Sequence, residues 1–277
     1  MSAVQRLLGT TQRALSRMPG VTLAAAKIRN QCNMIISTAL TTGSALEASG
    51  ETWLADAVAP GARYFVDVGA NVGEWTAMFA GRMRERPAGL LVEPNPAAAE
   101  RLRTRVAGEG RTGCEVLAAA AGERPDRLPF FAEEYCGETS SLHRPSVRVD
   151  FTVVEVDVVT LDQALADRKV DHVDMLKVDA EGHDFRVIQG AEGYLRAQRI
   201  DVLQFEYNKA WLNAGSTLAR AFEFLDGLGY ATRLLRKDGL ADYRIEAIGD
   251  FFNYSNFVAF RRDGLRPDLQ AALRRTL

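Results

Sequence analysis

The sequence predicts an α/β protein built on an open, mostly parallel β-sheet. Short β-branched and aromatic runs alternate along the chain with segments whose apolar residues recur at helical spacing. Strands that alternate with helices imply right-handed crossover connections, which make neighbouring strands parallel. The 277 residues are 47% hydrophobic and 25% charged, an ordinary globular composition that supports a sizeable core in one large domain.

The alternation begins with the strand-like run Tyr64–Val68, which ends at Gly69. The later elements are expected in this order: a helix over 75–83, a strand over 89–94, a helix over 96–106, strands over 114–120 and 173–178, a helix over 185–196, a strand over 200–205 and a late strand over 257–260. Between residues 128 and 158 the pattern changes to two-residue alternation. This change predicts an inserted β-hairpin.

Charge and cysteine usage exclude several classes of protein. Lys and Arg total 34 against 36 Asp and Glu, so a dedicated non-specific nucleic-acid binder is disfavoured. Cys32, Cys114 and Cys136 are odd in number and form no CxxC pair, which argues against a disulfide framework and a structural zinc cluster. Such usage suits a reducing compartment, and we expect the cytoplasm. The longest apolar run, Cys32–Leu40, is too short and too interrupted to span a bilayer.

The N-terminal segment differs in composition from the rest. We expect residues 1–55 to form a helical extension and residues 56–277 to form the main domain. No acidic residue precedes Glu47, whereas several basic residues do: Arg6, Arg13, Arg17, Lys27 and Arg29. The preferred interpretation is a helix that packs on the domain or on a second subunit. A transit sequence and a helix on an anionic membrane surface are the alternatives.

A glycine-rich turn follows the first predicted strand. It reads Asp67-Val68-Gly69-Ala70-Asn71-Val72-Gly73, in which Gly69 allows a sharp turn and Gly73 allows the next helix to start close to a ligand. Glu93 ends the second predicted strand, 26 positions after Asp67. A carboxylate at that place can accept hydrogen bonds from both ribose hydroxyls of an adenosine. The turn and Glu93 together predict an adenosine-containing cofactor.

Two cofactor classes use such a turn, the dinucleotides and S-adenosylmethionine. A dinucleotide site needs G-x-G-x-x-G because the middle glycine makes room for the pyrophosphate. Here the spacing is G-x-x-x-G with Asn71 in the middle, and Asp67 is poorly suited to a position beside a pyrophosphate. A carboxylate suits the ammonium and sulfonium groups of S-adenosylmethionine. We therefore expect this cofactor, bound by Asp67, Gly69, Asn71, Gly73 and Glu93, and an ordinary β–α turn without a cofactor is the alternative.

Several motifs together resemble the FkbM family of S-adenosylmethionine-dependent methyltransferases. They follow the family's order over roughly residues 63–260: Asp67–Gly73, Val92–Pro96, Thr139–Leu142, Val159–Asp162, Leu176–Asp184, Gly190–Glu192 and Gln204–Asn208. The K-x-D-x-E-G-x-[DE] block within Leu176–Asp184 is the specific one. The resemblance implies a Rossmann-like class I methyltransferase sheet and O-methylation of a sugar or specialised metabolite, as in natural product biosynthesis. It does not extend to residues 1–50.

The end of the fourth core strand is expected to face the methyl group of the cofactor. A hydroxyl acceptor benefits from a general base, because the pKa of a hydroxyl lies far above 7. Asp179 and His183 are the leading catalytic candidates, and Glu206 at the end of the next strand is a third. Each has a structural alternative: Asp179 can cap a helix, His183 can be a surface residue, and Glu206 can form an ion pair with Lys177.

Five further positions are weaker candidates for contact with the acceptor. Ser140, Ser141 and His143 lie in the inserted region, where loops commonly contact substrate. Tyr207 and Trp211 can form a flat wall for a ring-shaped acceptor, although core packing explains them equally well.

Two absences also shape the expected site. The stretch Leu117–Ala121 offers no acidic residue for the adenine amino group, so adenine is expected to meet backbone groups and apolar surface. Asp179, Glu181 and Glu206 have the chemistry of magnesium ligands, but the resemblance implies no metal, and we expect none.

Other functions remain as alternatives at this stage. An N-methyltransferase of a small molecule is the nearest one. A nicotinamide-dependent oxidoreductase belongs to a different class, and Asn71 and Asp67 argue against it. A non-catalytic cofactor-binding protein is disfavoured by the intact block at 177–184. The expected partner is a small-molecule or sugar acceptor and not a nucleic acid, and the N-terminal segment is a candidate for contacts within a homo-oligomer.

Overall fold

The structure, a computed structural model, describes residues 11–41, 43–133, 140–142 and 151–274. The chain divides into two compact units, Met1–Thr41 and Thr42–Leu277. In the first unit, the helix α2 (Val21–Leu40) has no buried residue. Among the described residues, no helix combines the length and the apolar character needed to cross a membrane.

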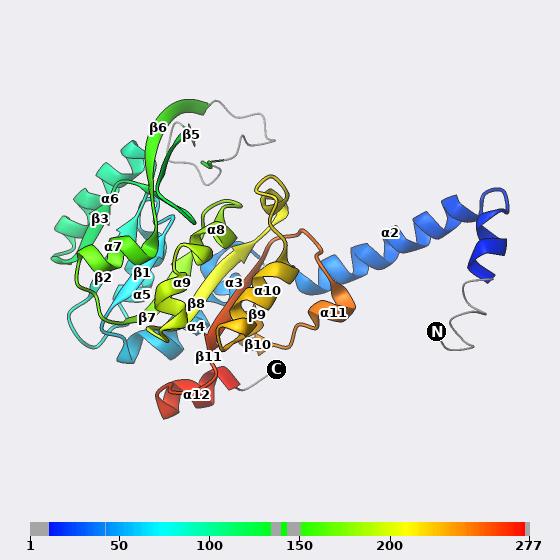
Figure 1. Ribbon diagram of the computed structural model, residues 1–277. Helices are drawn as coiled ribbons and strands as arrows, with labels where there is room; N and C mark the ends of the chain where they lie inside the picture. Colours follow the sequence, from blue (N-terminus) through cyan, green and yellow to red (C-terminus); the bar gives the residue numbers. More distant parts are fainter. Residues whose placement is uncertain (1–10, 42, 134–139, 143–150, 275–277) are drawn as a thin grey trace. The chain divides into compact units, whose positions relative to one another are not determined.

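An eight-stranded sheet forms the centre of the second unit (Figure 1). Its strands, in spatial order, are β10 (Gly239–Ala241), β9 (Tyr230–Arg236), β11 (Ser255–Arg261), β8 (Ile200–Tyr207), β7 (Val173–Val178), β1 (Phe65–Val68), β2 (Ala88–Val92) and β3 (Gly113–Leu117). The five strands from β3 to β8 pair in parallel, and β11 is antiparallel to both of its neighbours. Because β11 opposes both β8 and β9, these two strands run in the same direction. The open, mostly parallel sheet is therefore confirmed.

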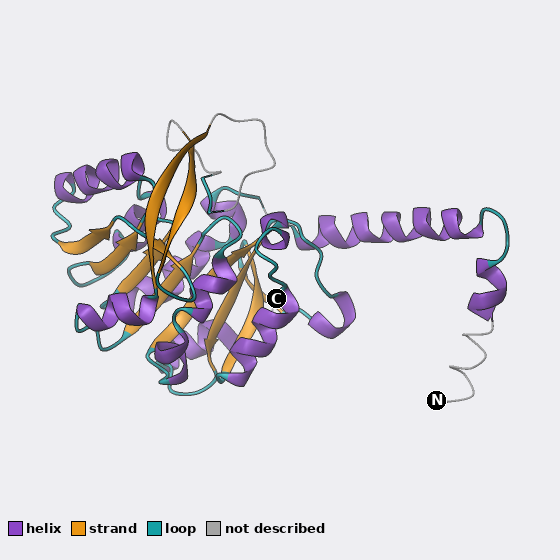
Figure 2. Cartoon of the chain, turned by 45° about the horizontal axis from the view of Figure 1, so that its top comes forward, coloured by secondary structure: helices purple, strands orange, loops and turns teal. Residues whose placement is uncertain are grey.

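Helices cover both faces of this sheet (Figure 2). They are α3 (Leu46–Ser49), α4 (Glu51–Val58), α5 (Glu74–Ala80), α6 (Pro96–Gly108), α7 (Leu161–Asp167), α8 (Asp184–Gln189), α9 (Glu192–Arg196), α10 (Leu218–Gly227), α11 (Ile245–Ile248) and α12 (Pro267–Arg274). Apolar side chains of α4, α5, α6 and α12 join one face in a single core that includes the fully buried Leu54, Phe79 and Leu102. On the face toward the viewer in Figure 1, α8 contacts β7 and β8, and α10 contacts β9.

The inserted hairpin is present and has an additional strand. The strands β5 (Asp126–Glu133) and β6 (Phe151–Val159) are antiparallel, and the short β4 (Ala120–Ala121) pairs with the other side of β6. Phe130, Val156 and Val158 form a small separate core within this sheet. Figure 1 shows the hairpin extending from the end of the main sheet at which the parallel strands finish.

Several elements differ from the expectation. The helix expected over 185–196 is divided into α8 and α9 at Gly190, where a Cβ atom would lie 2.0 Å from the carbonyl oxygen of Gly122. The side chain of Asp162 accepts hydrogen bonds from the backbone N–H groups of Gly193 (2.7 Å) and Tyr194 (2.9 Å), which fixes the start of α9. The strand expected over 114–120 ends at Leu117, after which the chain leaves for the inserted sheet. The strands β9 and β10 were not expected.

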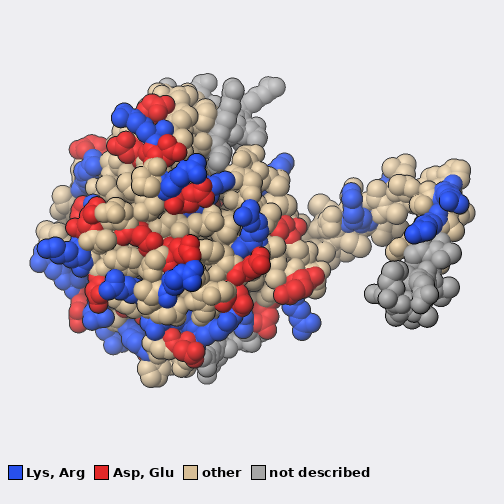
Figure 3. Space-filling model, in the orientation of Figure 1, with Lys and Arg blue, Asp and Glu red and all other residues tan. Residues whose placement is uncertain are grey.

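The second unit begins earlier than residue 56. Leu54, Ala55 and Val58 on α4 are buried in the main core, so this helix belongs to the sheet-containing unit. The division between the units falls after Thr41. On the face of the protein shown in Figure 3, basic and acidic side chains of the sheet-containing unit are interspersed, in keeping with the formal net charge of −2.

Candidate functional site

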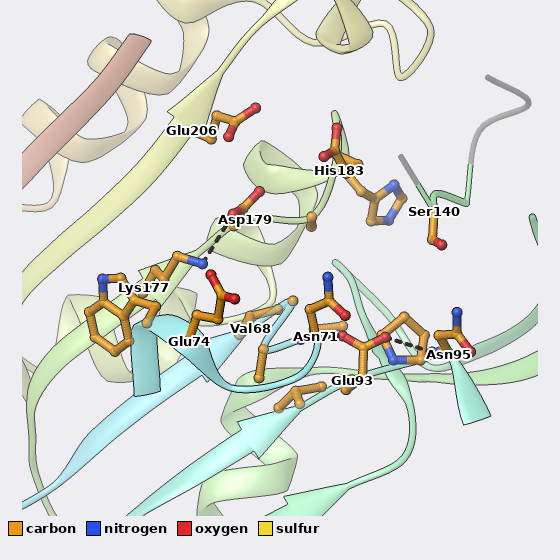
Figure 4. Close-up of a pocket in the computed structure, with 18 of the residues that line it drawn as sticks. Val68, Asn71, Glu74, Glu93, Asn95, Ser140, Lys177, Asp179, His183 and Glu206 are labelled. Atoms are coloured by element: carbon orange, nitrogen blue, oxygen red, sulfur yellow. Dashed lines mark hydrogen bonds and ion pairs between the residues drawn. The ribbon is translucent and has the colours of Figure 1, made fainter. Parts of the chain in front are cut away.

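A cavity of about 670 Å³ opens at the carboxyl ends of β1, β2, β7 and β8 (Figure 4). Its volume lies within the range of about 300–1,000 Å³ that is typical of small-molecule sites. Six carboxylates and one lysine are among the described residues that line it: Glu51, Glu74, Glu93, Asp179, Glu181, Glu206 and Lys177. This excess of carboxylates favours a ligand that carries positive charge.

The backbone at Gly69 brings two strand ends together. Gly69 has a φ of 77°, and a Cβ atom there would lie 1.8 Å from the carbonyl oxygen of Asp179. The N–H of Asp179 donates to the carbonyl oxygen of Val68 at 3.0 Å, so the ends of β1 and β7 touch at this point. Gly69 is therefore needed for the close approach of two backbones as well as for the turn.

Glycine is also required at position 73, but for a different reason from the expected closeness to a ligand. Its φ is 83°, and a Cβ atom would lie 2.6 Å from Cδ1 of Leu102 on α6. The glycine lets α5 start close to α6, and the structure gives no evidence of a ligand contact there.

The carboxylate of Glu93 is held by two backbone amides. Asn71 donates its N–H to Oε2, and Asn95 donates its N–H to Oε1, both at 2.7 Å. Glu93 is 5% exposed, and burial raises its pKa to about 7 against the opposing effect of the two amides. A carboxylate oxygen can accept more than one hydrogen bond, and Glu93 lines the cavity, so its two oxygens are available as oriented acceptors for a pair of ligand hydroxyl groups.

Asn71 adopts the left-handed conformation, with a φ of 45°, which is uncommon for a residue other than glycine. This conformation turns its backbone N–H toward Glu93. Asn71 therefore positions the Glu93 carboxylate through the backbone and also lines the cavity. The sequence placed both residues in the cofactor site but gave no indication that they contact each other.

Asp67 does not line the cavity, so a direct contact with a ligand, which the sequence suggested, has no support. It is 0% exposed beneath the turn. Its Oδ2 accepts from the hydroxyl of Thr76 at 2.6 Å, and its Oδ1 lies 3.7 Å from Nζ of Lys177. Burial raises the pKa of Asp67, and Lys177 opposes this shift. Asp67 therefore anchors Lys177 from below the cavity.

Lys177 links the floor of the cavity to Asp179. Its ammonium lies 3.0 Å from Oδ2 of Asp179 and 5.9 Å from the centre of the Trp75 ring. Burial disfavours the ammonium, but the carboxylates of Asp179, Asp67 and Glu51 together raise the pKa of Lys177. The lysine is therefore a permanent cation that orients Asp179, and it does not pair with Glu206 as one alternative held.

The catalytic candidates Asp179, His183 and Glu206 all line the cavity. Figure 4 shows the Asp179 carboxylate turned toward Lys177 and the His183 ring on the other side, near Ser140. His183 is 7% exposed and Glu206 is 8% exposed, so neither is a surface residue. The structure thus brings together three residues that the sequence selected separately.

Asp184 is a site residue to which the sequence gave no role. Its two carboxylate oxygens accept from the N–H groups of Ala180 (3.1 Å) and Gly182 (3.0 Å), which fixes the turn that carries Asp179 and Glu181. Asp184 is completely buried, and burial, with a further contribution from Asp179, raises its pKa to about 7. The signal in the sequence that could have identified Asp184 is its place as the last acidic residue of the Leu176–Asp184 block.

The inserted sheet closes one side of the cavity. Ser140 lines it and accepts from the N–H of Glu133 at 2.9 Å. The hydroxyl of Ser141 donates to the carbonyl oxygen of Glu181 at 2.9 Å, which ties the insertion to the turn after β7. His143, the third candidate in this region, lies outside the described residues.

The aromatic residues at the cavity differ from those expected. Tyr207 and Trp211 are fully buried in the core, where the Tyr207 hydroxyl donates to Asp250 at 3.0 Å. Trp75, Phe130 and Tyr254 line the cavity instead. Periodicity alone did not single out these three residues: Trp75 lies on the mostly buried α5, Phe130 on the partly exposed β5, and Tyr254 just before β11, outside the helices and strands.

Strand order, parallel pairing and a cavity at the carboxyl ends, with a carboxylate after β2, define a Rossmann-like class I methyltransferase fold. A family model described as the methyltransferase FkbM domain matches residues 67–232, more than half of the chain. The protein therefore belongs to the FkbM methyltransferase family and is a methyltransferase.

Solved structures show similarity at low sequence identity. Methyltransferase FkbM from Methylobacillus flagellatus KT is 16% identical with a TM-score of 0.45, over 70% of this chain and 43% of that chain. Precorrin-6y C5,15-methyltransferase from Geobacter metallireducens GS-15 is 11% identical with a TM-score of 0.44, over 82% and 95%. An O-methyltransferase from Bacillus cereus, in complex with SAH, is 12% identical with a TM-score of 0.42, over 83% and 86%. The chain thus spans less than half the length of the M. flagellatus protein. A comparison with curated proteins gave no match.

Proposed function

We propose that this protein transfers a methyl group from S-adenosylmethionine to a hydroxyl group of a sugar or specialised metabolite. The observation that carries the proposal is the cavity at the strand ends, where the buried, backbone-oriented Glu93 stands opposite Asp179 and His183. S-adenosylmethionine contains a ribose, which suits Glu93, and two cationic groups, which suit the acidic wall.

The residues present fit this cofactor. Glu93 would accept from the ribose hydroxyls, and Ala120, Ala121 and Phe130 offer an apolar wall for adenine at the expected place. The left-handed Asn71 leaves no middle glycine to make room for a pyrophosphate, so a dinucleotide fits this turn poorly.

Methyl transfer requires an aligned acceptor and a destination for its proton. When bound, S-adenosylmethionine supplies a methyl group that moves to the acceptor oxygen while the sulfur keeps the bonding electron pair. His183 takes the hydroxyl proton in this proposal, because Asp179 is already in an ion pair with Lys177 that protonation would break. Asp179 and Glu206 then position the acceptor. The inserted sheet, with Ser140 on the cavity wall, supplies further acceptor contacts.

A second acceptor class is favoured by one observation. The carboxylates of Asp179, Glu181 and Glu206 converge within 4.8 Å of one another, and an ammonium group is a suitable ligand for such a cluster. N-methylation of a small amine is therefore the second candidate.

A reducing compartment such as the cytoplasm is supported by Cys32 and Cys114, which are free thiols.

Calorimetry and a product screen test the proposed function. We expect S-adenosylhomocysteine to bind and NAD not to bind. Incubation with S-adenosylmethionine and panels of hydroxylated sugars, glycosylated metabolites and amines, followed by mass spectrometry, should show a product one methylene heavier among the hydroxyl compounds. Binding of NAD without binding of S-adenosylhomocysteine would contradict the cofactor assignment. Methylation confined to amines would replace the hydroxyl acceptor with the second candidate.

A further inference from the structure

Gly122 directly follows β4 and lies beside the imidazole of His183. Its N–H donates to the carbonyl oxygen of Val159 at 2.9 Å, which ties it to the inserted sheet. Gly122 is buried and does not line the cavity, whereas His183 does, as Figure 4 shows. Any effect of Gly122 on a bound molecule must therefore act through a neighbouring side chain.

The absence of a side chain at Gly122 leaves room for two neighbours. A Cβ atom at this position would lie 2.9 Å from Cγ1 of Val158 and 3.2 Å from Nε2 of His183. The φ of Gly122 is not positive, so its backbone conformation does not itself require glycine. Glycine is needed here because of the space that Val158 and the His183 ring occupy.

The groups around Gly122 have little freedom to make room for a side chain. Val158 is 3% exposed within the small core of the inserted sheet, and a β-branched side chain is stiff about χ1. On its other side the Gly122 carbonyl oxygen packs against Gly190, where a Cβ atom would lie 2.0 Å from that oxygen. The backbone of His183 is held too, because its N–H donates to the carbonyl oxygen of Ala180 at 3.1 Å. The His183 ring is the group that remains able to turn.

The geometry points to Gly122 as a positioning residue, and we propose that its missing side chain sets the orientation of the His183 imidazole in the cavity. A larger residue would crowd Nε2 and rotate the ring away from Gly122. The inserted sheet, which carries Gly122 and Val158, then does more than close one side of the cavity, because it also fixes where the imidazole stands.

The catalytic consequence rests on the proposed function, whereas the orientation of the ring does not. A base must lie within about 3 Å of the group whose proton it removes. A displacement of about 1 Å can lower a rate by about 10²-fold, so Gly122→Ala should lower kcat by about 10- to 100-fold. The KM for S-adenosylmethionine should change little, because Glu93 and the glycine-rich turn are unaltered.

Nuclear magnetic resonance of the histidine rings tests the orientation of His183 without an acceptor. The chain has three histidines, and the spectrum of His183→Ala assigns the resonances of this ring. Gly122→Ala should shift them and leave those of His172 unchanged, because His172 precedes β7 and lies 3.2 Å from Asp201. Gly108→Ala is the matched control, since a Cβ atom there would have nothing within 4 Å, and it should change neither.

Calorimetry with S-adenosylhomocysteine shows whether each variant is folded, and we expect an affinity within about twofold of wild type. Unchanged His183 resonances in a folded Gly122→Ala variant would overturn the proposal.

A double-mutant cycle measures the contact between the two positions even if Gly122→Ala folds poorly. The His183→Ala background removes the ring, so Gly122→Ala should lower the melting temperature less in this background than in the wild type. An equal loss in both backgrounds, complete unfolding included, would show that Val158 and not His183 requires glycine here.

Turnover on an acceptor from the product screen separates this inference from the proposed function. Near wild-type turnover of His183→Ala, with shifted His183 resonances in Gly122→Ala, would refute the proton role and support the positioning. Loss of turnover in His183→Ala, with wild-type resonances and wild-type turnover in Gly122→Ala, would support the proton role and refute the positioning.

Discussion

Replacing Glu93 with glutamine tests the assignment of the cofactor site. In the wild type both oxygens of Glu93 accept backbone N–H groups, from Asn71 and Asn95, at 2.7 Å. The variant keeps the shape of the side chain but loses its charge. One of its two terminal atoms becomes an NH2 group that faces a backbone N–H. The backbone N–H of Asn71 or of Asn95 therefore loses its acceptor, and the ribose hydroxyl groups lose a charged acceptor.

The magnitude follows from these contacts. A hydrogen bond to a charged group contributes about 1.5–3 kcal/mol, and about 1.4 kcal/mol corresponds to a tenfold change in affinity. Glu93→Gln should therefore weaken S-adenosylhomocysteine binding by roughly 10- to 150-fold in calorimetry. The amide left without its acceptor should also lower the free energy of unfolding by about 1–3 kcal/mol, visible as a reduced melting temperature.

The same experiment has a pH dependence of known sign. The raised pKa of Glu93, about 7 in the free protein, means that the carboxyl group is partly protonated near neutral pH. Ribose hydroxyl groups donate to the ionised form, so wild-type affinity should be highest above pH 7. It should then fall by up to about tenfold for each pH unit below that value. Glu93→Gln should lack this dependence.

A control and a clear refutation are available. Glu100→Gln makes the same chemical change on α6, where the side chain is 73% exposed, and should leave affinity and pH profile unchanged. If Glu93→Gln bound S-adenosylhomocysteine with wild-type affinity and a wild-type pH profile, Glu93 would not hold the ribose. The cofactor would then have to lie elsewhere in the cavity.

Three further outcomes are expected. Gly69→Ala should lower the melting temperature or prevent folding, because the added Cβ would meet the Asp179 carbonyl oxygen; a soluble variant of unchanged stability would disprove this contact. His183→Ala should reduce turnover by ~10²–10⁴-fold with nearly unchanged affinity for S-adenosylhomocysteine, and any decline of the wild-type rate toward acidic pH that persists at saturating cofactor should disappear; near wild-type turnover would remove His183 from the mechanism. Deletion of residues 1–41, a separate compact unit, should leave S-adenosylhomocysteine affinity within twofold, and a larger loss in calorimetry would show that this segment contributes to the site.

Local sequence patterns were sufficient for the core of the fold. The residues of β7, Val173–Val178, are all buried and had been predicted with the same bounds, because a strand covered on both faces is mostly apolar, although this one also contains Asp174 and Lys177. The turn after β1 and the position of Glu93 were predictable for the same reason, since both are fixed by where a strand ends.

Features that depend on packing between distant segments were not predictable. The interruption of the 185–196 helix depends on Gly122, whose carbonyl oxygen leaves no room for a side chain at Gly190. Tyr207 and Trp211 had suggested a substrate wall, but neighbouring helices and strands bury both. The local sequence around Gly190, or around Tyr207 and Trp211, does not reveal which distant segments will pack against these residues.

By itself, the sequence determined the α/β class, the family and the acidic residues at the strand ends, because each of these is encoded within a few consecutive residues. Only the tertiary structure decided which of those residues meet. Asp179 and Glu206 are 27 positions apart, and they share a cavity wall because β7 and β8 are adjacent parallel strands. Asp67 and Glu93 looked equivalent in the sequence, but one is sealed beneath the turn and the other faces the cavity. Burial and nearby charges set the pKa of a carboxyl group, and its position in the fold sets which groups it can contact. Both are properties of the folded chain.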